Sequence, residues 1–229
     1  MVVPVETIAA AAAASERDMF RDRRDAGEKL AAMLSDYRGR DGALLLALPR
    51  GGVPVASAVA HALALPLDVL AVHKIGAPSE PELAVGAVAE DGLIVLDEDA
   101  IAAMHISAAA LESVIARERA ELLRRERIYR GDRLPLALAG RIVLLIDDGL
   151  ATGYTMRAAI RAVRLRGAAR IVVAVPVASQ DTLDRLGAEV DHIVCVCIPR
   201  NLMAVGQFYE DFGQVSDEQV CEALFRQPE

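Results

Sequence analysis

Residues 143–155 read VLLIDDGLATGYT, and their pattern is the clearest indication of the fold in this chain. The apolar run Val143–Ile146 predicts a buried strand, because strands covered on both faces show no alternation of polar and apolar residues. The strand ends in two adjacent carboxylates, Asp147 and Asp148, and a helix is expected to begin at about Thr155. A strand, a short loop and a helix in this order indicate one unit of a parallel α/β sheet.

The loop between this strand and this helix has the composition of a phosphate site. Gly149 and Gly153 let the backbone bend closely around a ligand, and a helix start offers unpaired N–H groups at the positive end of its dipole. Thr152 and Thr155 add hydroxyl donors at the same place. The predicted phosphate loop comprises Gly149, Leu150, Ala151, Thr152, Gly153, Tyr154 and Thr155.

Asp147 and Asp148 cannot bind the same anion, because they are themselves negatively charged. Carboxylates at a strand end suit the hydroxyl groups of a sugar or a hydrated metal ion. The loop and the acids together predict a site for a phosphorylated sugar. The alternative is purely structural: the two aspartates cap the helix, and Thr155 is its N-cap.

Outward from this segment, short apolar runs alternate with helical patterns, which predicts a parallel sheet flanked by helices. Ligands of such sheets bind outside the carboxyl ends of the strands. Asp91-Gly92 is typical of a hairpin turn. Strands are expected at Ala43–Leu48, Leu67–Val72, Leu83–Ala89, Leu93–Leu96, Ile142–Ile146, Ile171–Val175 and Val190–Val196. Helices are expected over about 18 residues from Met19, and at Val53–Leu63, Glu98–Arg130, Thr155–Leu165 and Ser216–Phe225, the last with Ser216 as N-cap.

Composition excludes several classes of protein. The chain has 229 residues, 25 Lys and Arg against 33 Asp and Glu, and a net charge of −8, which argues against binding of nucleic acid. No stretch of about 18 residues is both apolar and free of charge, so no membrane span is expected. Its three cysteines form no disulfide framework, which favours the cytoplasm, and Cys195 and Cys197 read as buried filler. Residues 1–18 read as an Ala-rich extension, either frayed helix or disordered.

The run from Val143 to Thr155 resembles the phosphoribosyl-diphosphate (PRPP) signature of the type I phosphoribosyltransferases: four apolar residues, two acids and the spacing Thr-Gly-x-Thr. The resemblance implies the fold of that family over residues 19–229, with a helical insertion at 98–132 and a C-terminal hood at 198–215. It also implies that Asp147 and Asp148 hold the ribose hydroxyls, and Mg²⁺ through water or those hydroxyls, while the phosphate loop holds the 5-phosphate.

Family members bind pyrophosphate with a loop after the first core strand, and Pro49-Arg50-Gly51-Gly52 occupies that place. Arg50 can pair with phosphate oxygens in a forked geometry, and the glycines let backbone amides approach. Lys74 follows the second strand, where the family often places a basic residue that faces the diphosphate; the alternative is a solvated surface lysine. His73 reads as structural.

In the family, a variable hood after the last core strand holds the base that is to be modified. Here Phe208, Tyr209 and Phe212 lie within five residues, and a flat heterocycle would stack on such side chains. Asp211 or Glu210 would accept a proton from the base. The alternative, equally weighted, is that the aromatic rings pack the hood onto the sheet.

Two features depart from known family members. Enzymes for 6-oxopurines carry an Asp at the position of Ala151, so a hypoxanthine or guanine acceptor is disfavoured. The loop is closer to adenine-type sequences, but Gly149 and Tyr154 differ from those as well. Residues 76–92 correspond to the mobile loop of the family, although Leu83–Ala89 reads as an ordered hairpin.

The resemblance implies an Mg²⁺-dependent transfer of the phosphoribosyl group from PRPP to a nitrogen nucleophile, with a nucleobase as the favoured acceptor, as in nucleotide salvage. The expected partners are PRPP and a small nitrogen-containing acceptor, with no nucleic acid and no membrane, in a homodimer. Two alternatives remain: a regulatory protein that binds PRPP without transfer, and a receiver domain phosphorylated on an aspartate. The residues expected to carry catalysis are Asp147, Asp148, Lys74 and Arg50.

Overall fold

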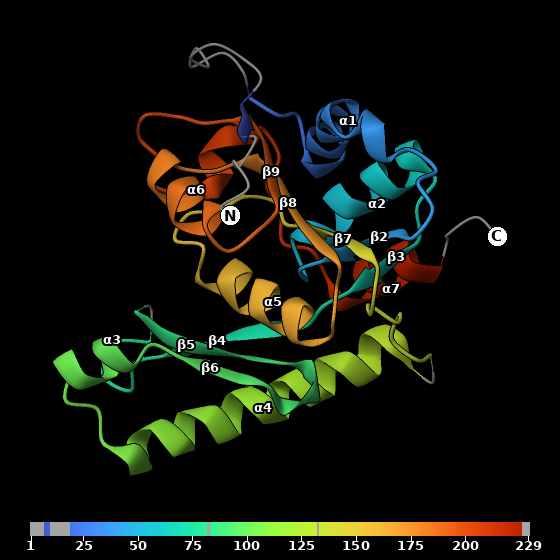
Figure 1. The fold of residues 1–229 in the computed structure, drawn as a ribbon. Coiled ribbons are helices and arrows are strands. Elements are labelled where there is room, and N and C mark those ends of the chain that lie inside the picture. Colours follow the sequence, from blue (N-terminus) through green and yellow to red (C-terminus); the bar gives the residue numbers. More distant parts are fainter. Residues whose placement is uncertain (1–6, 10–18, 82, 132, 226–229) are drawn as a thin grey trace.

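The computed structural model describes residues 7–9, 19–81, 83–131 and 133–225 (Figure 1). Within these residues, the main sheet has six strands in the order β1-β9-β8-β7-β2-β3, and every neighbouring pair is parallel. The strands are β1 (Thr7–Ala9), β2 (Ala43–Ala47), β3 (Leu67–Val69), β7 (Ile142–Ile146), β8 (Arg170–Val177) and β9 (His192–Cys197).

Helices cover both faces of the main sheet, because its strands carry apolar side chains on both sides. Leu44 and Leu46 of β2 pack on one face with α5 (Tyr154–Leu165) and α6 (Gln180–Gly187). Leu45 packs on the other face, which is covered by α1 (Arg23–Met33), α2 (Gly52–Leu63) and α7 (Asp217–Phe225). The predicted fold class, a parallel sheet flanked by helices, is confirmed.

A second, antiparallel sheet lies beside α5 (Figure 1). It consists of β4 (Val72–Gly76), β5 (Ala84–Ala89) and β6 (Ile94–Leu96), with a 3-10 turn, η2 (Glu90–Gly92), between the last two. One face of this sheet packs on α5 and the other on α4 (Ala108–Arg130). The predicted hairpin around Asp91-Gly92 is therefore confirmed, with Gly92 at a φ of +75°.

The predicted strand Leu67–Val72 is wrong in its extent, because the chain changes sheet within it. β3 ends at Val69, and β4 begins at Val72 by pairing with Ala89 of the second sheet. Between them, the N–H of Leu70 still bonds to the main sheet, 2.9 Å from the oxygen of Ala47. An unbroken apolar run cannot reveal such a change, since both sheets bury it.

The predicted single helix Glu98–Arg130 is also wrong, because it is broken into α3 (Glu98–Ala103) and α4. His105 has a φ of +51°, which ends the first helix. The side chains of Asp97 and Ser107 then cap the two helices, accepting N–H bonds at 3.0 and 3.3 Å. The pattern of charged residues continues across the break, so the sequence pattern does not reveal where the helix is interrupted.

Smaller differences concern the ends of the chain and one helix. Thr7–Ala9 of the predicted extension form a strand beside β9, rather than a frayed helix or a disordered segment; the rest of residues 1–18 lie outside the described residues. The helix α6 has no counterpart among the predicted helices, and the helix expected from Met19 is divided into α1 and the 3-10 turn Ser35–Tyr37. Ser216 caps α7 as predicted, its hydroxyl 3.2 Å from the N–H of Gln219.

Two further findings concern membrane-spanning helices and the cysteines. No helix in the described part of the chain is long and apolar enough to cross a membrane. Cys195 and Cys197 are buried on β9 and form no disulfide within the described residues, as predicted for filler.

Candidate active site

Two loops meet at the carboxyl ends of β7 and β2. A Cβ atom on Gly51 would overlap the carboxylate of Asp148, and one on Gly52 would lie 2.7 Å from the oxygen of Ile146. The glycines are therefore required for close approach of the backbone to the acids. The predicted pyrophosphate loop and the predicted acidic pair thus lie in contact.

The two aspartates form a crowded, largely buried pair of acids. Burial, and then the charge of Asp148, raise the pKa of Asp147 well above its usual range. Burial also raises the pKa of Asp148, while the guanidinium of Arg23 opposes that rise. Asp147 Oδ1 accepts the N–H of Asp148 at 2.9 Å, and neither aspartate caps α5. The capping alternative is therefore wrong, and carboxylates so placed are able to accept hydroxyl groups or a cation.

The phosphate loop between β7 and α5 is held in a fixed shape. The N–H of Leu150 bonds to the oxygen of Val177 at 2.8 Å, and Gly153 caps α5 with a φ of +76°. The first bond of the helix is donated by Arg157 to Gly153, at 2.9 Å. The preceding amides of the first turn therefore lack helical partners and lie at the positive end of the dipole, which suits a phosphate dianion.

Thr182 of α6 supports this loop from behind, and sequence reasoning missed it. Its hydroxyl donates to the oxygen of Ala151 at 2.9 Å and accepts from Ser179 at 2.9 Å. Its methyl carbon would lie 2.8 Å from a Cβ on Gly153, so the position demands glycine. Ser179, which caps α6, is the available signal, since a Ser before an apolar helical pattern marks a helix start.

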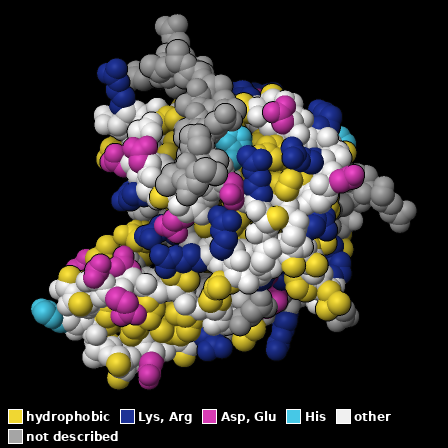
Figure 2. Space-filling model, in the orientation of Figure 1, with side chains coloured by type: hydrophobic (Ala, Val, Ile, Leu, Met, Phe, Trp, Pro, Cys, Tyr) yellow, Lys and Arg dark blue, Asp and Glu magenta, His cyan; other side chains and the backbone are white. Residues whose placement is uncertain are grey.

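Tyr154, the first residue of α5, lies at the edge of the phosphate loop. It lines a cavity of about 360 Å³ between α5 and the second sheet, together with Arg157 and Arg161. Figure 2 shows the surface hollowed between the main-sheet body and the second-sheet lobe, with charged side chains at the edge. Within the predicted phosphate loop, Thr152 is exposed, and Tyr154 and Thr155 are half-buried.

Arg50 lies at the rim of the site. Its side chain is 38% exposed, and its guanidinium is 3.9 Å from Asp217 at the start of α7. Asp217 is already engaged, because it accepts the hydroxyl of Tyr129 at 2.7 Å. The guanidinium is therefore held only loosely and remains available to an anion.

Lys74 is placed differently from the other candidates. It extends from β4, opposite Ala87, and so belongs to the second sheet rather than to the loops at the ends of the main-sheet strands. Its role at the site stays a prediction. The neighbouring His73 is 3.4 Å from Glu118 of α4, and burial lowers its pKa, in keeping with the structural role predicted for it.

In the hood, Tyr209 packs against other aromatic rings, as the second of the two interpretations predicts. Its ring lies between those of Phe20 and Phe212, with centroids 5.2 and 4.9 Å away, and its hydroxyl donates to the backbone oxygen of Asp148 at 2.6 Å. Phe208 is half-buried against the same cluster. Asp211 is exposed and accepts the N–H of Gly213 at 3.0 Å.

Arg23, at the start of α1, is the second residue that sequence reasoning missed. Its Nε donates to Asp148 Oδ2 at 2.8 Å, and its Nη1 donates to the oxygen of Gly213 at 2.7 Å. The guanidinium also lies 3.8 Å from the centre of the Phe212 ring. No local pattern could have found this contact, because the two partners are 125 residues apart.

Several known proteins are similar to this chain in sequence or in fold. A family model described as "Phosphoribosyl transferase domain" matches residues 18–206. A Mycobacterium tuberculosis H37Rv protein named "Putative phosphoribosyl transferase Rv0571c" is 47% identical over 210 residues, which cover 91% of this chain and 47% of that protein. The same identity and coverage hold for its counterpart in strain CDC 1551, MT0597.

The chain therefore spans about half the length of the curated relatives it matches. Among solved structures, the crystal structure of TT1426 from Thermus thermophilus is 45% identical with a TM-score of 0.79. The match covers 91% of this chain and 99% of that one, so an independent structure carries the same fold along nearly its whole length.

Proposed function

Because the chain belongs to the phosphoribosyl transferase domain family, we propose that it transfers the 5-phosphoribosyl group of PRPP to a nitrogen nucleophile and releases pyrophosphate. One observation carries the proposal. A glycine-lined loop lies against a buried acidic pair, directly before the free amides of α5. This arrangement offers an anion cup and hydroxyl acceptors side by side, which a phosphorylated sugar requires.

Each part of PRPP has a proposed place. The amides of residues 151–155 and the hydroxyls of Thr152 and Thr155 bind the 5-phosphate. Asp147 and Asp148 accept the ribose hydroxyls. The backbone of Gly51 and Gly52, with Arg50 and Lys74, binds the diphosphate.

The proposed reaction needs no covalent residue. The bond between C1 of the ribose and the pyrophosphate oxygen breaks, and its electron pair leaves with pyrophosphate. The lone pair of the acceptor nitrogen forms the new C1–N bond, and a proton then leaves the nitrogen. Positive charge develops on the ribose beside the aspartates and negative charge on the leaving group beside Arg50, so catalysis rests on positioning and electrostatics.

Mg²⁺ fits this donor set only together with its substrate. The described residues include no group of three or more His, Cys, Asp or Glu able to hold a metal. Mg²⁺ is commonly bound through one or two carboxylates plus substrate phosphates, and Asp147 and Asp148 would hold it in that way, through water or ribose hydroxyls. When bound, the ion supplies positive charge to the diphosphate.

The acceptor, the homodimer and the cytoplasmic location are further parts of the proposal. A nucleobase is the acceptor we favour, and the site residues open to it include Phe208 and Asp211. Tyr209 is occupied by Asp148, so we assign it to the hood's packing rather than to base stacking. The absence of an acid at Ala151 continues to disfavour 6-oxopurines.

The first test is the melting temperature with and without Mg-PRPP, with ribose 5-phosphate and pyrophosphate as separate controls. Ligand at about 100 times its dissociation constant stabilises a protein by roughly 2.7 kcal/mol. At about 2–4 °C per kcal/mol for a domain of this size, we expect a rise of roughly 5–11 °C. Asp148→Asn should fold and lose most of the rise.

Pyrophosphate release with a panel of nitrogen bases then tests transfer itself. Release with one acceptor supports the enzyme. PRPP binding without release for every base would instead support a regulatory PRPP-binding protein. No thermal shift at millimolar PRPP would reject both.

A further inference from the structure

Arg23 contacts one carboxylate of the proposed ribose site and is held by two further contacts to the hood. It bonds to Asp148 at 2.8 Å and to the hood at Gly213, and it stacks on Phe212. Its side chain is only 12% exposed, and that of Asp148 is 15% exposed. A guanidinium fixed at three points defines the orientation of the carboxylate that it touches.

The two oxygens of that carboxylate have different surroundings. Both oxygens lie near Gly51, Oδ2 closer than Oδ1, but only Oδ2 receives the bond from Arg23. No other described residue is hydrogen-bonded to Oδ1. The contact of Arg23 therefore uses one oxygen and leaves the other as an acceptor.

We propose that Arg23 is a positioning residue for ribose: it fixes Asp148 through Oδ2 so that Oδ1 faces the ribose hydroxyls of PRPP. This inference rests on the proposed function. Phe212 and Gly213 hold the guanidinium in place, so the hood and the ribose carboxylate are set by one side chain. Arg23 itself does not touch the reacting atoms.

A purely structural role predicts a different pattern. If Arg23 only joined α1 to the hood, its loss would lower the melting temperature and affect every ligand alike. As a positioning residue, it acts on ligands that contain ribose. Pyrophosphate reports on the loop at residues 49–52 and lacks ribose, so it separates the two roles.

The experiment compares Arg23→Gln and Arg23→Lys with wild type, and uses Arg24→Gln as the matched control. Arg24 is adjacent, is 81% exposed and pairs with Glu28 alone among the described residues. Dissociation constants are measured by calorimetry for Mg-PRPP, ribose 5-phosphate and pyrophosphate. We expect Arg23→Gln to weaken both ribose ligands about 10- to 100-fold, as for loss of a charge-assisted hydrogen bond.

The affinity for pyrophosphate should stay within about twofold of wild type, because Arg23 does not touch its loop. Arg23→Lys, which keeps the charge, should restore part of the ribose affinity, and Arg24→Gln should match wild type. If Arg23→Gln does not fold, Phe212→Leu weakens only the support of the guanidinium and should give a smaller loss with the same ligand pattern.

The possible negative results separate the proposed function from the role of Arg23. If wild type binds no PRPP, the proposed function is rejected, and this inference with it. If wild type binds PRPP and folded Arg23→Gln binds it equally well, or loses all three ligands to the same degree, the inference alone is overturned.

Discussion

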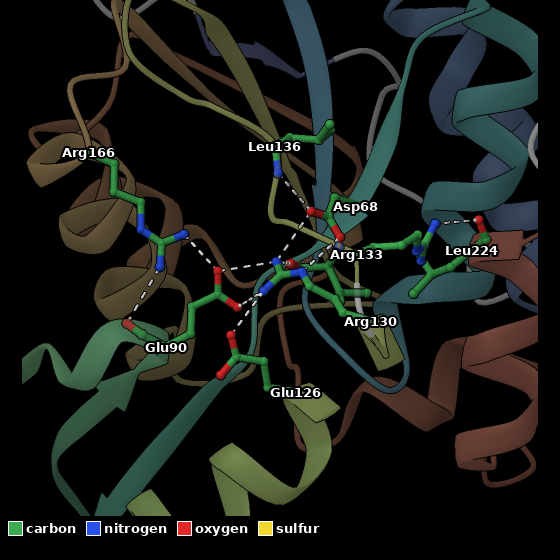
Figure 3. Close-up of polar contacts among 9 residues, drawn as sticks. Asp68, Glu90, Glu126, Arg130, Arg133, Leu136, Arg166 and Leu224 are labelled. Atoms are coloured by element: carbon green, nitrogen blue, oxygen red, sulfur yellow. Dashed lines mark hydrogen bonds and ion pairs between the residues drawn. The ribbon is translucent and has the colours of Figure 1, made fainter. Parts of the chain in front are cut away.

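Two clusters of the molecule bring arginine against a pair of acids, and they differ in charge balance. In the first, Asp68 of β3 and Glu90 of η2 share Arg130 of α4, at 3.3 and 2.7 Å, and Arg166 also bonds to Glu90, at 2.7 Å (Figure 3). In the second, Asp147 and Asp148 have one guanidinium, that of Arg23. Among the described residues, the first cluster has two arginines for its two buried acids, with the more exposed Glu126 3.5 Å from Arg130, and the second has one arginine for two acids.

This difference separates a structural cluster from a site. Asp68 also accepts the N–H groups of Val69 and Leu136, at 2.8 and 3.1 Å, so both of its oxygens are bonded. The cluster joins the main sheet, the second sheet, α4 and the end of α5, and it needs nothing from outside. The acidic pair has only Arg23 as a cationic partner among the described residues, and within that part of the chain Asp147 Oδ2 and Asp148 Oδ1 accept no hydrogen bond. A binding site for hydroxyls or a cation differs from an internal ion pair in this way.

The largest effect should come from Arg130→Met. The substitution leaves Asp68 and Glu90 buried without their shared cation, and such a loss costs about 3–5 kcal/mol of the free energy of unfolding. Chemical denaturation measures it. Arg127→Met, on an exposed turn of the same helix, should change stability by less than about 0.5 kcal/mol. If Arg130→Met were as stable as this control, the cluster around Arg130 would not stabilise the fold.

The next effect tests the support of the phosphate loop. Thr182→Val keeps the shape of the side chain but removes the donor to the oxygen of Ala151. The substitution also removes the acceptor of the Ser179 hydroxyl, and the loss of the two bonds together should cost about 1–3 kcal/mol. We also expect weaker binding of ribose 5-phosphate, because the amides of the loop lose their fixed position. Ligand affinity unchanged in a destabilised variant would show that the loop is held without α6.

A change of opposite sign is expected at the acidic pair. Asp147→Asn removes a charge that burial and Asp148 oppose, so it should stabilise the fold by about 1–2 kcal/mol at pH 7, as functional residues often do when replaced. PRPP affinity should fall. A destabilised Asp147→Asn would mean that the pair is structural after all.

The same substitution gives a dependence on pH. A carboxyl whose pKa is raised by folding stays protonated to a higher pH in the folded state than in the unfolded one. The contribution of this carboxyl to the free energy of unfolding is fully present below the ordinary pKa of the group. It is lost as the pH rises through the raised pKa of the folded state. The stability of wild type should therefore fall relative to Asp147→Asn as the pH is raised from about 4 toward neutrality. Parallel curves for the two proteins would contradict the raised pKa.

How far the sequence predicts each region follows from the range of the contacts. The strand, acids and loop at residues 143–155 are one local segment, so their order predicts the sheet and the place of the site. The pairs Arg23–Asp148 and Arg130–Asp68 join positions 125 and 62 residues apart, and no periodicity marks such partners. The change of sheet after Val69 escapes prediction for the same reason: it depends on which strand lies beside Val72.

Tyr209 shows the limit most clearly, and it gives the smallest predicted effect. Aromatic residues in the hood suit base stacking or packing equally well by sequence, and only the bond to the oxygen of Asp148 separates the two. Tyr209→Phe keeps the ring packing and loses that bond, so it should cost about 0.5–1.5 kcal/mol in the free energy of unfolding. Because the bond fixes the backbone of Asp148, PRPP affinity should fall modestly as well.

Tyr37→Phe is the matched control. It removes a comparable bond, 3.1 Å to His192, away from the acids, and should lower stability without changing PRPP affinity. Equal affinities for the two variants would mean that Asp148 is held by Arg23 alone, and the acidic pair would then differ from the Arg130 cluster even more than the charge balance implies.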